Sequence, residues 1–448
     1  PLRDWWVEVD LGRVVWAQKV VVKFAAEGAG DPFLQFKVLT SNGDPAFQQS
    51  QSLGYKVAGR SEGLNKTQRV FEYDLRPSRR PDPGLSGDLV QYVQIVATAS
   101  DGRQGAEISQ ATWNNLTQDE AEARAGLVGA VEYELAISLR AGSPGYEGDC
   151  IIRFEHADPS AGTFLDFTGK EILRFELNGA EVDAASWRSH RLQLEGGLLR
   201  AQNEVRIVYR NDFDHDGIGL HKFTDPEDGL EYIYTHFEPF DAHRLFPCFD
   251  QPDIKASYRL RVGAPAEWAV VGNSPEVGRG DAGNGQVIRE YEQTPRFSTY
   301  LVALVAGPYH VFEETYESAD GSQAVPLKVL CRESLAKHMD PDEFFETTKQ
   351  GLAFFGEFFD FPYPFAKYDQ VFVPEFNMGA MENVGCITFS ERMVFRDPPT
   401  ELQRLGRAEV VLHEMAHMWF GDLVTMRWWD DLWLNESFAT YMAYLALA

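Results

Sequence analysis

The strongest constraint on the fold of this chain is a pair of histidines that stand four residues apart near its C-terminal end. His413 and His417 enclose Glu414 in the motif His-Glu-Met-Ala-His, and Glu436 follows nineteen residues after the second histidine. On an α-helix, four residues turn the chain by roughly 400°, so both imidazoles leave one face a turn apart. Glu436 falls in a second predicted helix. The two helices therefore have to pack with their inner faces converging on one point.

The residue types in this motif indicate a metal. Two imidazoles one turn apart suit bonds of about 2.0–2.1 Å to one Zn²⁺, and a carboxylate completes the three-ligand set of a catalytic zinc. The sequence predicts one zinc per chain, bound by His413, His417 and Glu436. Glu414 lies off the ligand face, where the general base for a water belongs. The alternative is two core histidines; with 10 His in 448 residues, a chance match is about one in a hundred.

Composition excludes several classes of partner. The formal net charge of −27 and the pI near 4.8 argue against nucleic acid and anionic membrane surfaces. No apolar run approaches the roughly 18–20 residues of a transmembrane helix. The cysteines form no C-x-x-C pair, which is typical of buried thiols in a reducing compartment, so a cytoplasmic location is expected. These cysteines are Cys150, Cys248, Cys331 and Cys386.

The hydrophobic pattern changes along the chain and predicts a multidomain protein. Residues 1–113 alternate apolar and polar positions between Gly, Pro and Asn turns, and predict a first domain of β-structure. Residues 114–308 keep the period of two and predict a larger, mostly-β domain. Residues 309–448 change to a mixed α/β pattern. The clearest strands of the first domain are predicted at 6–11, 19–24, 33–39 and 91–97.

Helices are predicted where capping signals precede apolar residues. A helix at 116–126 has Thr117 at its N-cap and Glu120 three residues later, the pattern of a capping box. Another begins at Asp340, an N-cap residue followed by Pro at the first helical position and acids in the first turn. The zinc motif and Glu436 are placed on helices at 400–420 and 430–448.

An acidic stretch in the second domain invites comparison with a calcium loop. Residues 212–217 read Asp-Phe-Asp-His-Asp-Gly. The twelfth position of such a loop should be a bidentate Glu and is Phe223 here, and no pair of helices is predicted around it. A polar loop is therefore the better interpretation.

A second motif indicates which kind of substrate a zinc hydrolase with this sequence would cleave. It lies some thirty residues before His413, just after a predicted strand. A glycine there lets the backbone approach a substrate closely, and a carboxylate held beside the metal selects a substrate with a free ammonium group. In a protease this means cleavage at N-termini. The motif consists of Gly379, Ala380, Met381, Glu382 and Asn383.

Together these motifs resemble the aminopeptidase N family of zinc metallopeptidases, the gluzincins. The resemblance covers about residues 114–448 and extends through 235–239, 246–252 and 428–436. It implies a saddle-like β-domain over 114–308 and the first part of a thermolysin-like α/β zinc domain over 309–448. The implied activity is of the membrane alanyl aminopeptidase type, with broad specificity for peptides that have a free N-terminus.

The resemblance also implies a role for each matching residue. It gives zinc binding to His413, His417 and Glu436, and the general base to Glu414. It implies that Glu238 and Glu382 bind the substrate's ammonium group. The other implied substrate-binding residues are Gly379 and Ala380, through backbone contacts, with Met381 and Asn383 of the same motif.

One residue departs from the family pattern beside this site. Many members have Gln where this chain has His236, two residues before Glu238. The change bears on the wall of the substrate pocket and on its response to pH, and it leaves Glu238 in place.

The end of the sequence bears on activity. The family stabilises the oxyanion with zinc and a Tyr several dozen residues beyond the last zinc ligand, and this sequence ends at Ala448. Loss of one oxyanion donor typically costs about 10²–10³ in rate. We therefore expect a C-terminally truncated fragment that binds zinc and hydrolyses peptides poorly.

Other functions remain open at this stage. Residues 4–12 and the strand at 91–97 resemble discoidin-type, galactose-binding-like sandwiches, which leaves a glycan-recruited peptidase as one alternative. A zinc-binding remnant without activity is a second alternative. A third is the epoxide-hydrolase-like branch of the same family, which shares the zinc site and the ammonium-binding Glu.

Overall fold

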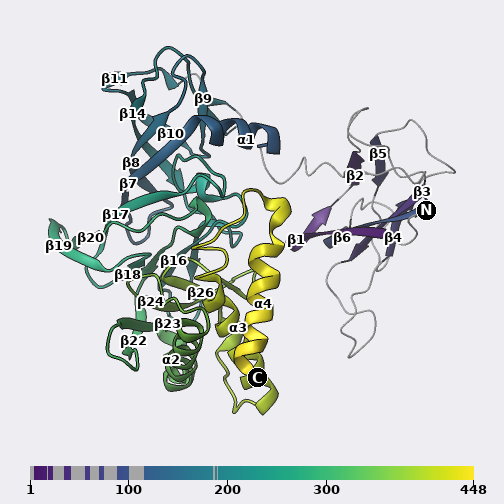
Figure 1. The fold of residues 1–448 in the computed structure, drawn as a ribbon, viewed down its shortest axis with the longest axis vertical. Helices are drawn as coiled ribbons and strands as arrows, with labels where there is room; N and C mark the ends of the chain where they lie inside the picture. The colour runs from purple at the N-terminus through teal and green to yellow at the C-terminus, as the bar shows by residue number, and fades with distance from the viewer. Residues whose placement is uncertain are drawn as a thin grey trace. The chain divides into compact units, whose positions relative to one another are not determined.

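The chain forms two compact units, Pro1–Asn114 and Asn115–Ala448. The computed structural model in Figure 1 draws both units as ribbons. It describes residues 5–17, 19–23, 35–41, 56–60, 70–74, 88–99, 116–184, 187–188 and 190–448.

The described part of the first unit consists of antiparallel strands in two sheets. One sheet has the order β1-β6-β3-β4, and β2 pairs with β5 in the other. Phe36 of β3 packs edge-on against Phe71 of β5 at 4.8 Å, which joins the two sheets through a small core. The predicted β-structure is confirmed for the described residues, whereas Asp4, Phe24, Phe33 and Leu34 of the predicted segments lie outside them. The strands are β1 (Trp5–Ala17), β2 (Lys19–Lys23), β3 (Gln35–Ser41), β4 (Lys56–Arg60), β5 (Val70–Asp74) and β6 (Asp88–Ala99).

The second unit begins with helix α1 (Gln118–Leu127), and its N-terminus is as predicted. The Thr117 hydroxyl accepts from the amide of Glu120, whose carboxylate accepts from the Thr117 amide. An eight-stranded sheet follows, in the order β11-β10-β14-β8-β7-β17-β20-β19. Its strands are β7 (Val128–Ser138), β8 (Gly145–His156), β10 (Glu171–Leu177), β11 (Ala180–Glu181), β14 (Gln202–Asp212), β17 (Ala256–Pro265), β19 (Glu276–Gly283) and β20 (Gln286–Tyr291).

Two smaller sheets complete the mostly-β region. The sheet β15-β16-β21-β18 matters most for function, because β16 leads directly into Glu238. Its strands are β15 (Gly219–Thr224), β16 (Glu231–His236), β18 (Ala269–Gly272) and β21 (Leu304–Gly307). The other sheet contains β9 (Thr163–Asp166), β12 (Trp187–Arg188) and β13 (Arg191–Leu194).

The α/β region starts with a five-stranded sheet, in the order β22-β23-β24-β26-β25. Strands β23, β24 and β26 run parallel, and the two edge strands run antiparallel to their neighbours. The strands are β22 (Tyr309–Glu317), β23 (Ala324–Arg332), β24 (Tyr368–Val373), β25 (Ala380–Met381) and β26 (Cys386–Ser390). Short 3₁₀ helices occur at Ala242–Arg244, Thr299–Leu301, Glu333–His338, Glu391–Met393 and Trp429–Asp431.

Three helices follow: α2 (Pro341–Phe358), α3 (Glu401–His417) and α4 (Trp433–Leu447). They differ from the prediction in one N-cap, in the end of α3 and in the start of α4. Asp340 occupies the N-cap position of α2, but its side chain makes no cap hydrogen bond. Helix α3 ends at His417, before the predicted residue 420, because Gly421 reverses the chain at φ 131°. Helix α4 begins at Trp433, after the 3₁₀ turn that precedes it.

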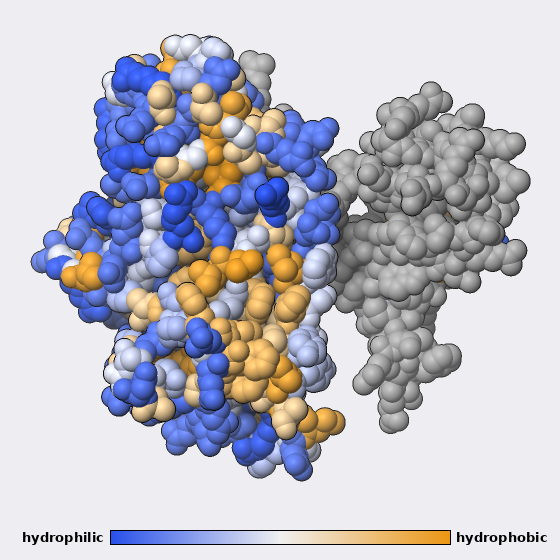
Figure 2. Space-filling model, viewed as in Figure 1, coloured by the Kyte–Doolittle hydropathy of each residue, from blue (hydrophilic) through white to orange (hydrophobic). Residues whose placement is uncertain are grey.

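Helix α4 has two different faces. Ala439, Met442 and Ala443 are buried, and α4 packs beside α3 as Figure 1 shows. Hydrophobic residues also reach the surface along α4 (Figure 2). Trp433, Phe438, Tyr441 and Tyr444 are among the exposed large side chains. None of the helices in the described ranges is both long enough and apolar enough to cross a membrane.

A buried ion pair fastens α1 to the β-domain. Arg124 Nη1 lies 2.7 Å from Asp166 Oδ2 at the end of β9, and Arg124 Nε donates to Gln251 Oε1 at 2.6 Å. Asp166 Oδ2 also accepts from the amide of Asp250 at 3.1 Å. Asp250 and Gln251 belong to the stretch 246–252 that the resemblance singled out, so part of that stretch serves the packing of α1.

Replacing Arg124 should therefore destabilise the second unit strongly. Arg124→Met leaves Asp166 buried without its cation, and breaking one side of a buried pair costs about 3–5 kcal/mol. Arg261→Met is the matched control, because Arg261 pairs with Glu290 on the surface, where ion pairs add little. Denaturant unfolding of both variants measures the difference, and an equally small loss in both would contradict the structural role of Arg124.

Candidate metal centre

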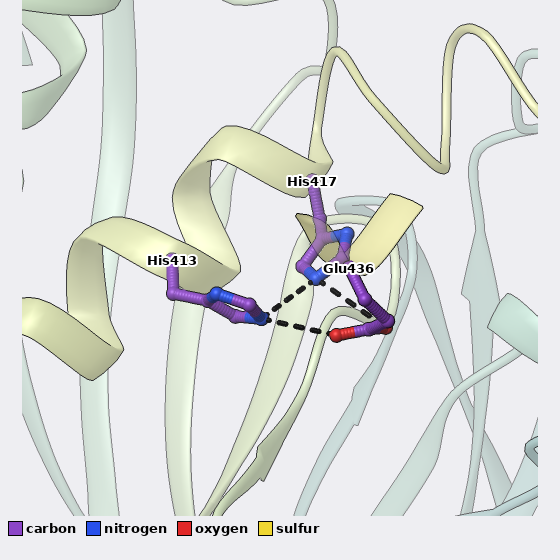
Figure 3. Close-up of side chains that lie close together, drawn as sticks. All are labelled: His413, His417 and Glu436. Atoms are coloured by element: carbon purple, nitrogen blue, oxygen red, sulfur yellow. Dashed lines mark hydrogen bonds and ion pairs between the residues drawn. The ribbon is translucent and has the colours of Figure 1, made fainter. Parts of the chain in front are cut away.

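The predicted metal ligands come together at the point where α3 and α4 meet. His413 Nε2 and His417 Nε2 lie 3.0 Å apart on one face of α3. Glu436, in the first turn of α4, places Oε2 3.3 Å from His413 Nε2 and Oε1 3.8 Å from His417 Nε2. Figure 3 shows the three side chains pointing toward one another. The convergence predicted from the spacing in the sequence is thus present.

The outer nitrogen of each imidazole already has a partner. His417 Nδ1 is 3.0 Å from the carbonyl oxygen of Phe420, and His413 Nδ1 is 3.3 Å from Thr440 Oγ1. Such contacts hold the ring orientation of metal-binding histidines and leave Nε2 for the metal. Burial lowers the pKa of His417 to about 4, against the opposing charge of Glu436, so the ring is neutral as a ligand must be.

These three residues fit a metal ion. Tetrahedral ligand atoms with bonds of about 2.0–2.1 Å lie roughly 3.3–3.4 Å apart, close to the separations found here. Burial acts to raise the pKa of Glu436, but the hydrogen bond to His413 and the neighbouring His417 lower it overall, so this carboxyl is ionised. Two imidazole lone pairs and a carboxylate facing one another are a donor set that needs a cation between them.

Further carboxyl groups surround this cluster. Ligand atoms of Glu382, Glu414 and His417 lie within 4.8 Å of one another, and so do those of Glu238, Glu382 and Glu436. Glu382 and Glu414 are buried, with 3% and 5% of their surface exposed. No lysine or arginine in the described ranges forms an ion pair with any of these four glutamates, and Glu382 Oε1 has no hydrogen-bond partner. The cluster therefore gathers four acids with no lysine or arginine to offset their charge when they ionise.

The pKa values of these groups reflect the crowding. Burial and the nearby Glu436 raise the pKa of Glu238 to about 8. Burial, together with Glu238 and Glu436, raises the pKa of Glu382 well above its usual value. Burial and the charge of Glu436 do the same for Glu414. A bound cation is the physical means by which such groups become ionised.

Two separate elements position the outer glutamates. Glu238 follows β16, and Glu382 follows β25 directly. Strand β25 pairs with β26, and Gly379 O accepts from the amide of Ser390 at 2.9 Å, which fixes the start of the motif. The glycine is exposed and Ala380 is half-buried, so their backbone is accessible from outside.

The remaining motif residues are placed differently. Met381 is buried, and Asn383 donates from Nδ2 to Thr388 Oγ1 of β26 at 3.2 Å. Met378 is 44% exposed just before the motif. His236 is buried, its Nδ1 has no partner, and burial lowers its pKa to about 4, so it stays neutral near pH 7.

Sequence reasoning missed Gly421 and Asp422. Asp422 is fully buried, neither of its carboxylate oxygens has a partner, and burial raises its pKa well above the usual value. Gly421 has φ 131°, and a Cβ there would lie 3.1 Å from His417 Nδ1 and 3.3 Å from Asn435 Nδ2. The signal in the sequence was a glycine just after a predicted helix end, a position that needs a left-handed backbone.

Comparison with known proteins connects this geometry to one family. Residues 131–301 match the peptidase M1 N-terminal domain, and residues 343–448 match the peptidase family M1 domain. An aminopeptidase N from Streptomyces lividans is 47% identical over 330 residues, which cover 73% of this chain and 38% of that protein.

Two archaeal proteins are also similar. A leucyl aminopeptidase from Saccharolobus solfataricus is 34% identical over 321 residues, covering 70% of this chain and 38% of the relative. A probable aminopeptidase 1 from Sulfurisphaera tokodaii is 36% identical over 284 residues, covering 63% and 34%. The chain spans a little over a third of the length of these relatives.

A methyl group at Gly421 should weaken metal binding. Gly421→Ala strains the backbone and pushes on His417 and Asn435, and disturbing such supporting contacts typically costs 10–100-fold in metal affinity. Gly406→Ala is the control, because Gly406 lies on α3 with open space around its Cα. Competition with a chromophoric chelator measures the zinc affinity of both, and equal affinities would contradict the assigned role of Gly421.

Proposed function

The chain belongs to peptidase family M1, and on that premise we propose that it forms the zinc-binding and substrate-binding part of an aminopeptidase, which releases N-terminal amino acids from peptides. The supporting observation is that Glu238 and Glu382 meet Glu436 within 4.8 Å, next to the His413–His417 pair. Carboxylates without a protein cation, gathered beside a metal site, suit a substrate that brings its own positive charge.

Within this proposal each part of the chain has an assigned place. Residues 114–308 are the saddle-like N-terminal domain, and 309–448 are the first part of a thermolysin-like catalytic domain. Residues 1–113 are a discoidin-like sandwich. Every residue of the glutamate and histidine cluster found among the described residues lies in the second unit. The four cysteines are free and buried, which favours a reducing, cytoplasmic compartment.

The free amine of the substrate is the group that Glu238 and Glu382 bind. Both carboxyls are brought to the cluster from separate elements, and an ammonium group between them would satisfy Glu382 Oε1, which has no partner. An ammonium held there leaves only the first peptide bond within reach of the metal ligands. This geometry accounts for removal of one residue at a time from the N-terminus.

The reaction needs a proton carrier as well as a metal. A zinc ion held by His413, His417 and Glu436 supplies Lewis acidity and lowers the pKa of water toward 7. Glu414 accepts the proton of the attacking water and delivers it to the leaving amine. Its side chain is buried, and burial with the charges of Glu436 and Glu238 raises its pKa. A cation bound by the metal ligands would offset this shift and leave Glu414 ionised, so that it can accept the proton.

The alternatives from the sequence receive no comparable support. The three relatives described above are named aminopeptidases, and none carries the name of an epoxide hydrolase. A remnant that only binds zinc would not require Glu238 and Glu382 beside the metal ligands. Glycan recruitment depends on the first unit, where no described residue contributes to the cluster.

Glu414→Gln should keep the metal and lose turnover. The amide retains the shape of the side chain but cannot accept a proton, and general acid–base catalysis contributes about 10²–10⁴-fold. Hydrolysis of leucine 4-nitroanilide and zinc content are measured together, in a form of the protein whose wild type is active. Glu401→Gln, at the exposed start of α3, is the control. Loss of zinc from Glu414→Gln would mean that Glu414 is a ligand.

Glu382→Gln should discriminate between free and blocked amines. Losing a charged partner for an ammonium group is expected to lower kcat/KM for leucine 4-nitroanilide by at least about tenfold. The rate with N-acetyl-leucine 4-nitroanilide should change far less, because that substrate has no ammonium group. Equal losses on both substrates would show that Glu382 does not bind the amine.

A further inference from the structure

The acidic stretch that resembled a calcium loop has a different partner in the structure. The loop 213–218, here called the brace loop, connects β14 to β15. Arg244 Nη2 forms a short ion pair with Asp214 Oδ1 and lies 3.4 Å from Asp216 Oδ2. Asp214 Oδ2 also accepts from the amide of Leu220 at 3.0 Å. A guanidinium therefore neutralises these carboxylates and holds the loop in one shape.

The brace loop contacts the segment that leads to the substrate motif. Residues 374–379, here called the motif loop, connect β24 to β25 and end three residues before Glu382. Asn377 of the motif loop donates from Nδ2 to the carbonyl oxygen of Asp216 at 2.7 Å. Gly217 is packed against the same side chain: a Cβ at this position would lie 2.4 Å from Asn377 Nδ2. The two loops leave no room for a methyl group between them.

The brace loop also continues into the strand pair that leads to Glu238. Gly219, the first residue of β15, lies opposite His236, the last residue of β16. His221 of β15 accepts from the amide of Gly217 at 3.0 Å and lies 3.5 Å from Glu375 of the motif loop. One short loop thus contacts the motif loop, which leads to Glu382, and continues into the strand that pairs with β16, which leads to Glu238.

Aromatic packing supports the same junction. Phe376 of the motif loop is buried, and its ring meets those of Tyr234 and His236 of β16 edge-on at 5.7 and 5.2 Å. The motif loop is therefore held between β26 on one side, through Gly379, and the brace loop and β16 on the other.

We propose that the brace loop sets the spacing of Glu238 and Glu382, with Gly217 and Asn377 as positioning residues for recognition of the substrate's free amine. The inference rests on the proposed function, because it assumes that these two glutamates bind an ammonium group. A displacement of about 1 Å away from the chemistry can cost 100-fold in a site of this kind. The contact between the loops determines how well one ammonium group fits both carboxylates.

Gly217→Ala tests the proposal, and Gly229→Ala is its matched control. Gly217 has φ 81° and Gly229 has φ 75°, so both alanines suffer the same backbone strain. Only the alanine at 217 meets Asn377, because nothing lies within 4 Å of a Cβ at 229. The inhibition constants of L-leucine hydroxamate and N-acetyl-L-leucine hydroxamate report amine recognition separately from metal binding.

We expect Gly217→Ala to weaken inhibition by L-leucine hydroxamate about 10- to 100-fold. Inhibition by the acetylated probe and the zinc content should be unchanged, and Gly229→Ala should match the wild type with both probes. Asn377→Ala, which removes one hydrogen bond without strain, should weaken the free-amine probe about three- to tenfold. It also serves as the test if Gly217→Ala does not fold.

The double variant separates positioning from general strain. Truncating Asn377 removes the two closest atoms that an alanine at 217 would meet and leaves the Glu375 carbonyl oxygen at 3.2 Å, so Gly217→Ala with Asn377→Ala should come close to Asn377→Ala alone. The proposal is overturned if Gly217→Ala and Asn377→Ala behave like Gly229→Ala, or if both probes weaken equally. A wild type that does not distinguish the two probes would instead overturn the proposed function, since no ammonium group would then be recognised.

Discussion

The concentration of carboxyl groups around one pair of histidines is the constraint on which this structure depends. Glu382, Glu414 and Asp422 are buried, and Glu238 and Glu436 complete the group without a lysine or arginine as partner in the described ranges. Burying like charges together is unfavourable, and it raises the pKa of most of these acids. In the proposed function, a bound metal ion and a substrate ammonium group would restore the balance.

The carboxyls are held by elements that belong to different parts of the second unit. Strand β16 of the mostly-β region leads to Glu238, β25 at the edge of the α/β sheet leads to Glu382, and helices α3 and α4 carry the remaining ligands. The site is therefore as rigid as the junction between these elements. Contacts at that junction, such as Asn377 with the carbonyl of Asp216, act on the geometry of the site without touching it.

Local chemistry explains which features were readable from the sequence. The capping residues Thr117 and Glu120 placed the start of α1 correctly, and the four-residue spacing placed both histidines on one face of α3. Asp340 was expected to cap α2 through its side chain and does not, because the N-cap position permits that bond without requiring it. The acidic stretch at 212–217 was correctly predicted as a polar loop, but its partner Arg244 is some thirty residues away, and no local pattern indicated it.

The sequence by itself determined the histidine pair of the donor set, since residue type and helical period are local properties of His413 and His417. It indicated Glu382 through the carboxylate of its own motif, and Glu238 only through the family resemblance. Only the tertiary structure decided that ligand atoms of these two acids lie within 4.8 Å of Glu436. It also decided that Asp422 is buried and that Gly217 packs against the side chain of Asn377. Such proximities arise from strand pairing and helix packing between residues that are far apart in the chain, where sequence spacing carries no distance information.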